Sequence, residues 1–414
     1  MIDSSVRNEL LDRFIRYASI GTQSDPDRAG AGTMPSTESQ RAFAESLAGE
    51  LRALGAEASV DGNGYVLARV APSAGLESVP PFGLSAHLDT SSEAPGDGVR
   101  PVVHERWNGE TIRLADGLML DPAKDAELAS CVGHTIITSD GTTLLGADDK
   151  AGLAAIMTLV SVLSRDTSVR HGEIEILFSP DEETGHGMDK VPLDRVKSKF
   201  FYTVDGGHAG EIEAECFNAW RCDVTFTGVS AHLGTAKGKM VNAVTMASSF
   251  VTELPADEAP ETTEGREGYF CPLEITGGVE TASVTVFLRD FELAAIEKKI
   301  ARVGEIAEGI RARFPRGSVD VRVSRQYLNM RDRLRESPEI VERLEKAVRA
   351  AGIEPVLKPI RGGTDGSRLT EMGIPTPNVF TGGHNYHSRT EWASLDQMES
   401  TVRTLVELAR VRGE

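Results

Sequence analysis

The stretch FGLSAHLDT, residues 82–90, decides the fold class of this 414-residue chain. Phe82 to Leu88 is a short apolar run that gives way to polar residues, as a strand does when both of its faces are buried. Farther along, Ala151 to Leu163 has an apolar helical pattern, and 173–178 and 200–204 are predicted as further strands. Strands that alternate with helices predict an α/β domain whose helices flank a mostly parallel central sheet.

The pattern changes near Phe217, after which apolar residues alternate strictly with polar ones from Trp220 to Phe226. Strict alternation is typical of a strand with one covered face. The segments that follow are predicted as helix, strand, strand, helix and strand, at 242–254, 270–275, 284–288, 296–310 and 319–323. This order suits a small two-layer α+β unit of the split-βαβ type. We therefore expect residues 217–325 to be inserted into a larger domain of residues 1–216 and 326–414.

Composition and charge exclude several kinds of partner. The chain has 44 Lys and Arg against 63 Asp and Glu, a net charge of −19, so neither nucleic acid nor an anionic membrane surface is an expected partner. The longest weakly polar stretch, Ala151 to Ser164, is too short for a membrane span. The four cysteines are too sparse for a disulfide scaffold, and the first residues lack the pattern of a signal peptide. We expect a cytoplasmic location.

Clusters of carboxylate and imidazole side chains follow the predicted strands of the larger domain. They are His87-Leu88-Asp89, Asp148-Asp149, Asp181-Glu182-Glu183, Asp205-Gly206-Gly207 and His384-Asn385-Tyr386-His387. Any one of them could cap a helix, but five at one sheet edge would crowd anions together unless a cation neutralised them. Mixed imidazole and carboxylate ligands suit Zn²⁺ or a similar ion, whereas all-oxygen sets suit Ca²⁺ or Mg²⁺.

Two histidines and three carboxylates are more ligands than one tetrahedral ion needs. Two ions that share one bridging carboxylate would use all five. A catalytic ion of this kind lowers the pKa of a bound water toward about 7, and the water still needs a base. Adjacent glutamates such as Glu182 and Glu183 can divide this work, one as ligand and one as base. The sequence contains no H-E-x-x-H, G-x-S-x-G, P-loop or dinucleotide fingerprint.

Seven segments in chain order resemble the M20 metallopeptidases: SAHLDT, LLGADDKAG, SPDEETG, VDGG, GVSAHLGTAKGKMVNA, RGGTDG and FTGGHNYHSRTEW. The resemblance covers nearly the whole chain, and GADDKAG and GTAKGKMVNA point to the tripeptide aminopeptidase branch of that family. It implies two zinc ions per subunit with Asp148 as the bridging ligand. The other implied ligands are His87 and Asp205 for one ion, and Glu183 and His387 for the other.

The same resemblance implies roles for other residues. Glu182 would be the general base, Asp89 would orient the His87 ring, and the peptide bond after Asp148 would be cis. In the inserted domain, His232 would hydrogen-bond the oxyanion, and Arg289 or Arg361 would bind the terminal carboxylate of the peptide. Either arginine could instead form an ordinary surface ion pair, and His384 is an alternative to His387 as a ligand. The residues that follow His387, from Ser388 to Trp392, differ from the family pattern.

The expected function is a zinc-dependent aminopeptidase that releases the N-terminal residue of short peptides, tripeptides in particular. The alternatives are another M20 amidohydrolase (a carboxypeptidase, a dipeptidase or an N-acyl amino acid deacylase), which would need the same water. A non-catalytic peptide-binding protein on the same fold is a further alternative, but such a protein is expected to have lost the base or a ligand. The two-domain layout favours closure of the inserted domain over the larger one as a lid. Family members often pair through the inserted domain, which favours a homodimer formed through it.

Overall fold

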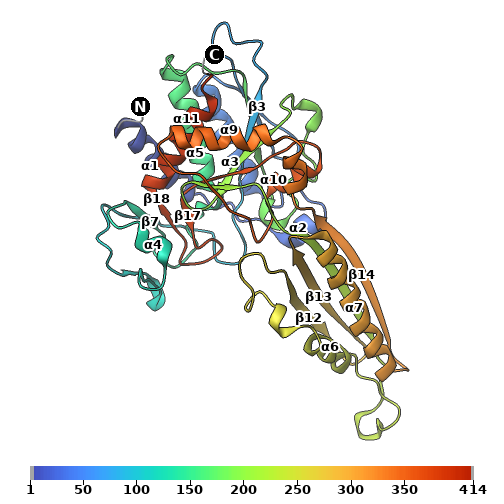
Figure 1. Ribbon diagram of the computed structural model, residues 1–414. Helices are drawn as coiled ribbons and strands as arrows, with labels where there is room; N and C mark the ends of the chain where they lie inside the picture. The colour runs from blue at the N-terminus through green and yellow to red at the C-terminus, as the bar shows by residue number, and fades with distance from the viewer. Residues whose placement is uncertain (1–3, 412–414) are drawn as a thin grey trace. The chain divides into compact units, whose positions relative to one another are not determined.

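A computed structural model of the chain describes residues 4–411. The chain forms two compact units, and Figure 1 shows the elements of each. Unit 1 is built from the residues up to Ala214, from Asp332–Lys358 and from the residues from Thr364 onward. Unit 2 consists of Glu215–Arg331 and Pro359–Gly363.

Unit 1 contains a mixed sheet which, within residues 4–411, has eight strands in the order β1-β2-β8-β3-β9-β16-β10-β15. Its strands are β1 (Glu57–Val60), β2 (Val66–Val70), β3 (Phe82–His87), β8 (Ile174–Ser179), β9 (Phe201–Gly206), β10 (Glu211–Glu213), β15 (Val356–Leu357) and β16 (Asn378–Phe380). The central strands β8, β3, β9 and β16 are parallel, as predicted. The prediction of a mostly parallel sheet is wrong toward the edges, because the pairs β1–β2, β2–β8 and β10–β16 are antiparallel. The edge pair β10–β15 is parallel.

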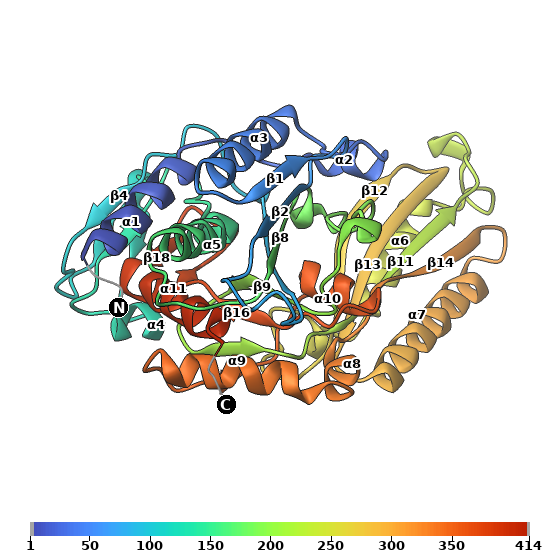
Figure 2. The same cartoon turned by 90° about the horizontal axis from the view of Figure 1, so that it is seen from above.

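Helices flank this sheet and bury its faces. The central one is α5 (Ala147–Arg165), which packs against β3 and β9 and is buried along almost its whole length. Helices α1 (Ser4–Ala18) and α11 (Leu395–Ala409) pack against α5, and α9 (Pro338–Ala350) packs against α11, as Figure 2 shows from above. Helix α3 (Glu38–Ala53) covers β1 and β2. Helix α5 has apolar residues on every side, as is typical of a helix inside the core.

A second, smaller sheet in unit 1 was not predicted. It has the order β17-β18-β7-β4, from β17 (Gly383–His384), β18 (Trp392–Ser394), β7 (Ile136–Thr138) and β4 (Val102–His104). The hairpin β5 (Ile112–Arg113) and β6 (Met119–Leu120) and the helix α4 (Ala126–Ser130) lie in the same part of the chain. The buried side chains of Trp107, Leu128 and Trp392 form its core. This sheet holds the two ends of the loop that carries His387.

Unit 2 is an antiparallel sheet of order β12-β13-β11-β14 with two helices packed on it. The strands are β11 (Asn218–Thr227), β12 (Tyr269–Gly277), β13 (Thr281–Asp290) and β14 (Ser318–Tyr327), and the helices are α6 (Ala243–Thr252) and α7 (Leu293–Arg313). An element stands at each position predicted for the inserted segment. The alternation from Trp220 to Phe226 has its cause here, because Cys222, Val224 and Phe226 are buried in the core with residues of α6 and α7.

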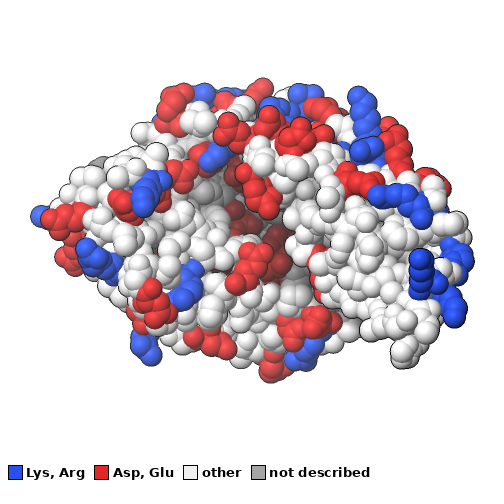
Figure 3. All heavy atoms as spheres, turned by 90° about the horizontal axis from the view of Figure 1, so that it is seen from below, with Lys and Arg blue, Asp and Glu red and all other residues white. Residues whose placement is uncertain are grey.

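The surface carries the charge expected from the composition. Figure 3 shows patches of Asp and Glu side chains scattered over one face, interspersed with Lys and Arg. Among the helices of residues 4–411, none is both long enough and apolar enough to cross a bilayer.

Candidate metal centre

The five side chains predicted as metal ligands lie together in unit 1. His87 is the last residue of β3, Asp205 lies at the end of β9, and Glu183 lies in a short 3₁₀ turn (Glu182–Thr184) directly after β8. Asp148 lies in the first turn of α5, and His387 lies in the loop between β17 and β18. Because β3, β8 and β9 are parallel neighbours, their carboxyl ends meet at one edge of the sheet and bring distant parts of the sequence together. The prediction that each cluster follows a strand is wrong for Asp148, which lies in the first turn of a helix.

Asp148 stands between the two histidines. Its Oδ1 is 2.8 Å from His87 Nε2, and its Oδ2 is 3.4 Å from His387 Nε2. His87 Nε2 is also 3.6 Å from Asp205 Oδ1, and His387 Nε2 is 2.9 Å from Glu183 Oε2. Each carboxylate oxygen of Asp148 therefore faces a different imidazole, with a second carboxylate beside each ring. This is the arrangement that a bridging ligand requires.

The chemistry of this donor set fits a bound pair of divalent cations. Oε1 of Glu183 is buried and has no hydrogen-bond partner within the described part of the chain, a costly state for a carboxylate oxygen unless a cation contacts it. Burial and the nearby Asp148 charge raise the pKa values of Glu183 and Asp205 to about 7. Burial acts in the same direction on Asp148, but hydrogen bonds with His387 and His87 outweigh it and lower the pKa of that carboxyl. Imidazole with carboxylate is a donor set for zinc or a similar ion.

Asp89 contacts both the His87 ring and the backbone of the two glutamates. His87 Nδ1 is 3.1 Å from the carbonyl oxygen of Asp89 and 3.4 Å from its Oδ1. The two carboxylate oxygens of Asp89 accept the N–H groups of Glu182 at 3.0 Å and Glu183 at 3.1 Å. This fully buried side chain is therefore placed to orient an imidazole and to fix the turn that carries both glutamates.

Glu182 is half-buried beside the cluster of ligands. Burial, together with the negative charges of Asp365, Asp205 and Glu183, holds the pKa of Glu182 well above its usual range. A carboxyl group whose pKa is raised in this way retains an accepted proton long enough to pass it on. Its turn is also held from the other side, because Asp181 accepts the Ser36 N–H at 2.7 Å and the Gln40 side-chain N–H at 2.8 Å.

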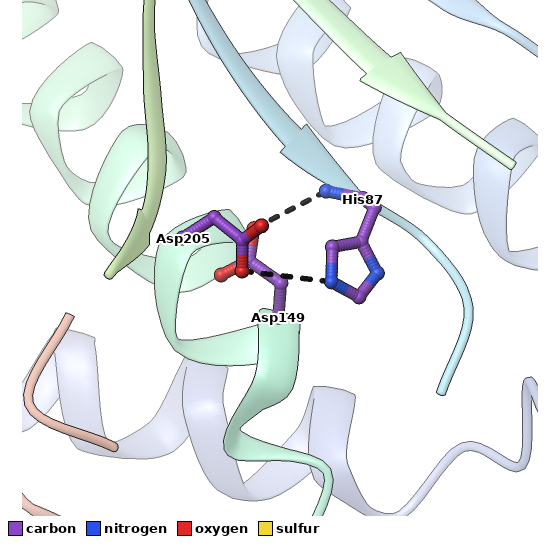
Figure 4. Close-up of side chains that lie close together, drawn as sticks. All are labelled: His87, Asp149 and Asp205. Carbon is purple, nitrogen blue, oxygen red and sulfur yellow. Dashed lines mark hydrogen bonds and ion pairs between the residues drawn. The ribbon is translucent and has the colours of Figure 1, made fainter. Parts of the chain in front are cut away.

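Two neighbouring carboxylates were not assigned roles from the sequence. Asp149, drawn in Figure 4 with His87 and Asp205, accepts the backbone N–H of His87 at 3.2 Å and that of Gly152 at 3.1 Å. The peptide bond between Asp148 and Asp149 is cis, as the resemblance implied. Glu93 Oε2 is 3.2 Å from His387 Nδ1, so this ring also has a carboxylate on its second nitrogen. The sequence signal for Asp149 was its place after the bridging residue, but Glu93 gave no signal.

His384, the alternative ligand, is engaged elsewhere. Its Nδ1 is 2.8 Å from Glu127 Oε2, its Nε2 is 3.2 Å from Gln397 Oε1, and its ring stacks on Trp392 at 3.9 Å. The same Gln397 also lies 3.2 Å from His208 Nδ1. The structure therefore gathers His387, and not His384, with Glu183 and Asp148.

The three residues predicted to bind substrate belong to unit 2. His232 is exposed, and its Nδ1 accepts the Gly234 N–H at 3.2 Å. Arg289 is buried and donates to the carbonyl oxygens of Trp220 at 3.2 Å and Leu288 at 3.0 Å. Arg361 donates to backbone carbonyl oxygens and a hydroxyl of the segment 263–267. Both guanidinium groups also lie over aromatic rings.

Comparison with known proteins places this geometry in a family. Peptidase T of Shouchella clausii (strain KSM-K16) is 45% identical over 407 residues, 98% of this chain and 98% of that one. The crystal structure of aminopeptidase PepT from Bacillus cereus ATCC 10987 has a similar fold, with a TM-score of 0.72 at 23% identity over 97% of this chain and 98% of that chain. The Bacillus subtilis YXEP protein, described as a dinuclear metal binding peptidase from the M20 family, gives a TM-score of 0.64 at 14% identity, with 98% of each chain covered. The model of peptidase family M20/M25/M40 matches residues 139–411, and the chain belongs to this family.

Proposed function

We propose that the protein is a metal-dependent aminopeptidase that releases the N-terminal residue of short peptides, with tripeptides as the main substrates. The observation that carries the proposal is Asp148 between His87 and His387, with the unpartnered oxygen of Glu183 beside them. The similarity to peptidase T over 98% of the chain supports the substrate class.

Asp148 lies between two pairs of residues, each of which would hold one of two zinc ions together with Asp148. His87 and Asp205 lie on one side of its carboxylate, and Glu183 and His387 lie on the other. When bound, such ions polarise a carbonyl group and lower the pKa of water toward about 7. Zinc itself, rather than another divalent ion, is the expectation from the mixed imidazole and carboxylate set.

Glu182 is the residue to which we assign proton transfer. Its carboxylate accepts a proton from the water that attacks the scissile carbonyl carbon, and it delivers that proton to the amide nitrogen as the C–N bond breaks. Asp89 holds the backbone N–H of Glu182, so it keeps the base in place while the proton moves.

Contacts of His232, Arg289 and Arg361 with the substrate are part of the proposal. Of the three, His232 is the exposed side chain, whereas both guanidinium groups already donate to backbone carbonyl oxygens. Replacing His232 with Ala tests the oxyanion role, since such a contact is worth about 3 kcal/mol in the transition state. An unchanged kcat would remove His232 from the mechanism.

A panel of peptides tests the function. Free, N-acetylated and C-amidated tripeptides, with a dipeptide and a tetrapeptide of the same residues, are incubated with the zinc-loaded protein and with Glu182→Gln as the inactive control. We expect release of the N-terminal residue from the free tripeptide, and weaker turnover of the C-amidated one, which lacks the terminal carboxylate assigned to Arg289 or Arg361. Preferential turnover of the N-acetylated peptide would indicate a deacylase, and release of the C-terminal residue would indicate a carboxypeptidase.

Three further assignments remain predictions. Residues 217–325 are proposed as the lid and dimerisation domain, which sedimentation of the full chain would test through its oligomeric state. A cytoplasmic location is tested by cell fractionation. Metal analysis of the purified protein tests whether zinc is the ion present.

A further inference from the structure

Glu391 has a buried carboxylate and lies at the C-terminal end of the loop that carries His387. Only 1% of its surface is exposed. Its Oε2 accepts the backbone N–H groups of Leu145 and Gly146, both at 2.7 Å, and its Oε1 accepts the N–H of Asp148 at 3.1 Å. These are charge-assisted hydrogen bonds, which are stronger than those between neutral groups.

The segment that donates these bonds is the entry to α5. Gly146 has a left-handed backbone with φ of 77°, and Asp148 has φ of −86° and ψ of 103°, outside the helical region. The first N–H groups of any helix have no partner within that helix. The backbone here also departs from helical geometry. Three N–H groups of this turn donate to the Glu391 carboxylate, which thereby fixes the conformation of the turn.

The turn matters because Asp148 has its two oxygens directed at His87 and His387. Glu391 lies four residues after His387 and directly before β18, which pairs with β7. A single side chain thus joins the backbone of Asp148 to the loop of His387, although the two segments are 243 residues apart in sequence.

We propose that Glu391 is a positioning residue for the metal centre: it fixes Asp148 relative to His387 and so sets the geometry of both cation sites. The inference rests on the proposed metal-dependent function. It differs from a purely structural role, in which Glu391 would stabilise the fold without affecting how the ligands hold a cation.

Glu175 provides a matched control in the same unit. It is also buried, with 4% exposed, and its carboxylate accepts the backbone N–H groups of Lys197 at 2.9 Å and Ser198 at 2.7 Å. It lies four residues before Ser179, which pairs with His87, so it is about 13 Å along the strand from the edge that carries the ligands. Glu175→Gln should therefore cost stability without disturbing the ligands.

The experiment compares metal-free wild type, Glu391→Gln and Glu175→Gln by competition of Zn²⁺ with a chelating dye, by the absorption spectrum of added Co²⁺, and by urea unfolding. We expect Glu391→Gln to bind Zn²⁺ about 10- to 100-fold more weakly and to change the Co²⁺ spectrum. Glu175→Gln should match wild type in both, although both variants lose stability. Wild-type affinity and spectrum in Glu391→Gln would overturn the inference.

If Glu391→Gln does not fold, Glu391→Asp retains the charge but shortens the side chain by one methylene, and it should weaken Zn²⁺ binding to a smaller extent; wild-type affinity in that folded variant would overturn the inference. If the wild type itself binds neither Zn²⁺ nor Co²⁺, the proposed metal centre fails and the inference fails with it. The two kinds of failure are thus distinguished.

Discussion

Asp89→Asn is the substitution that most sharply separates the stability of the site from its chemistry. The carboxylate of Asp89 accepts two N–H groups, those of Glu182 and Glu183, and lies beside the ring nitrogen Nδ1 of His87. An asparagine in the same position has one acceptor oxygen, and its NH₂ group faces a donor. One backbone N–H therefore loses its partner.

The size of each effect can be worked from these contacts. Leaving a buried donor unpaired costs about 1–3 kcal/mol, and because both N–H groups are only partly buried, we expect the lower part of that range, about 1–2 kcal/mol of unfolding free energy. Loss of a carboxylate that orients a metal-binding imidazole typically costs about 10- to 100-fold in metal affinity or activity. As a rate effect this is about 1.4–2.7 kcal/mol of transition-state stabilisation.

The assay has three parts: urea unfolding of the metal-free protein, Zn²⁺ affinity by dye competition, and kcat on a free tripeptide at saturating Zn²⁺. Asp181→Asn is the control, because Asp181 holds the same turn through Ser36 and Gln40 without touching His87. It should lower stability and leave the Zn²⁺ affinity as in wild type. An Asp89→Asn protein with wild-type Zn²⁺ affinity and kcat would refute the role assigned to Asp89.

Three other perturbations test different parts of the site. Glu182→Gln should reduce kcat by at least about a hundredfold while metal content by elemental analysis stays unchanged; a near wild-type rate would exclude Glu182 as the base. Dialysis against a strong chelator should abolish peptide hydrolysis and added Zn²⁺ should restore it, so full activity of protein shown to be metal-free would contradict the proposal. In the metal-free protein the neighbouring carboxylates outweigh desolvation and raise the pKa of His387 to about 12 and that of His87 well above its usual value. Both rings are then protonated at pH 7, and Zn²⁺ must displace their protons to bind. Calorimetry should therefore show that Zn²⁺ binding weakens as pH falls from 8 to 5 and that protons are released to the buffer. Binding that does not depend on pH would count against imidazole ligands.

Much of the fold could be predicted because its elements have strong sequence patterns. The apolar run at 82–88 and the apolar helix at 151–163 are buried, and β11 alternates because one face of its sheet is covered. The small sheet of β4, β7, β17 and β18 could not be predicted, since strands of two or three residues show no period. The antiparallel edges of the main sheet were missed for a related reason: strand direction is set by the connections between strands and not by the strand residues themselves.

Four of the five proposed ligands, all except His387, follow or begin an element of recognisable pattern. His387 lies between strands of only two and three residues, and its role was implied by the resemblance to the M20 family. Glu391 and Glu93 were not accessible from sequence, because their partners are a backbone turn and a ring nitrogen far away in the chain. Gln397 shows the same limit. Ser394 caps α11 by accepting the Gln397 N–H, but the Gln397 side chain accepts the N–H of Ala209, and the Ser394 N–H donates to the carbonyl oxygen of Gly382. Local spacing identifies a cap, whereas tertiary contacts decide where a long polar side chain is used.

The most direct test of the central claim is an anomalous difference map at the zinc edge from crystals grown with Zn²⁺. The account predicts two peaks about 3.5–4 Å apart on either side of the Asp148 carboxylate, one beside His87 and the other beside His387. No peak at this position, or a single peak that does not contact Asp148, would contradict it.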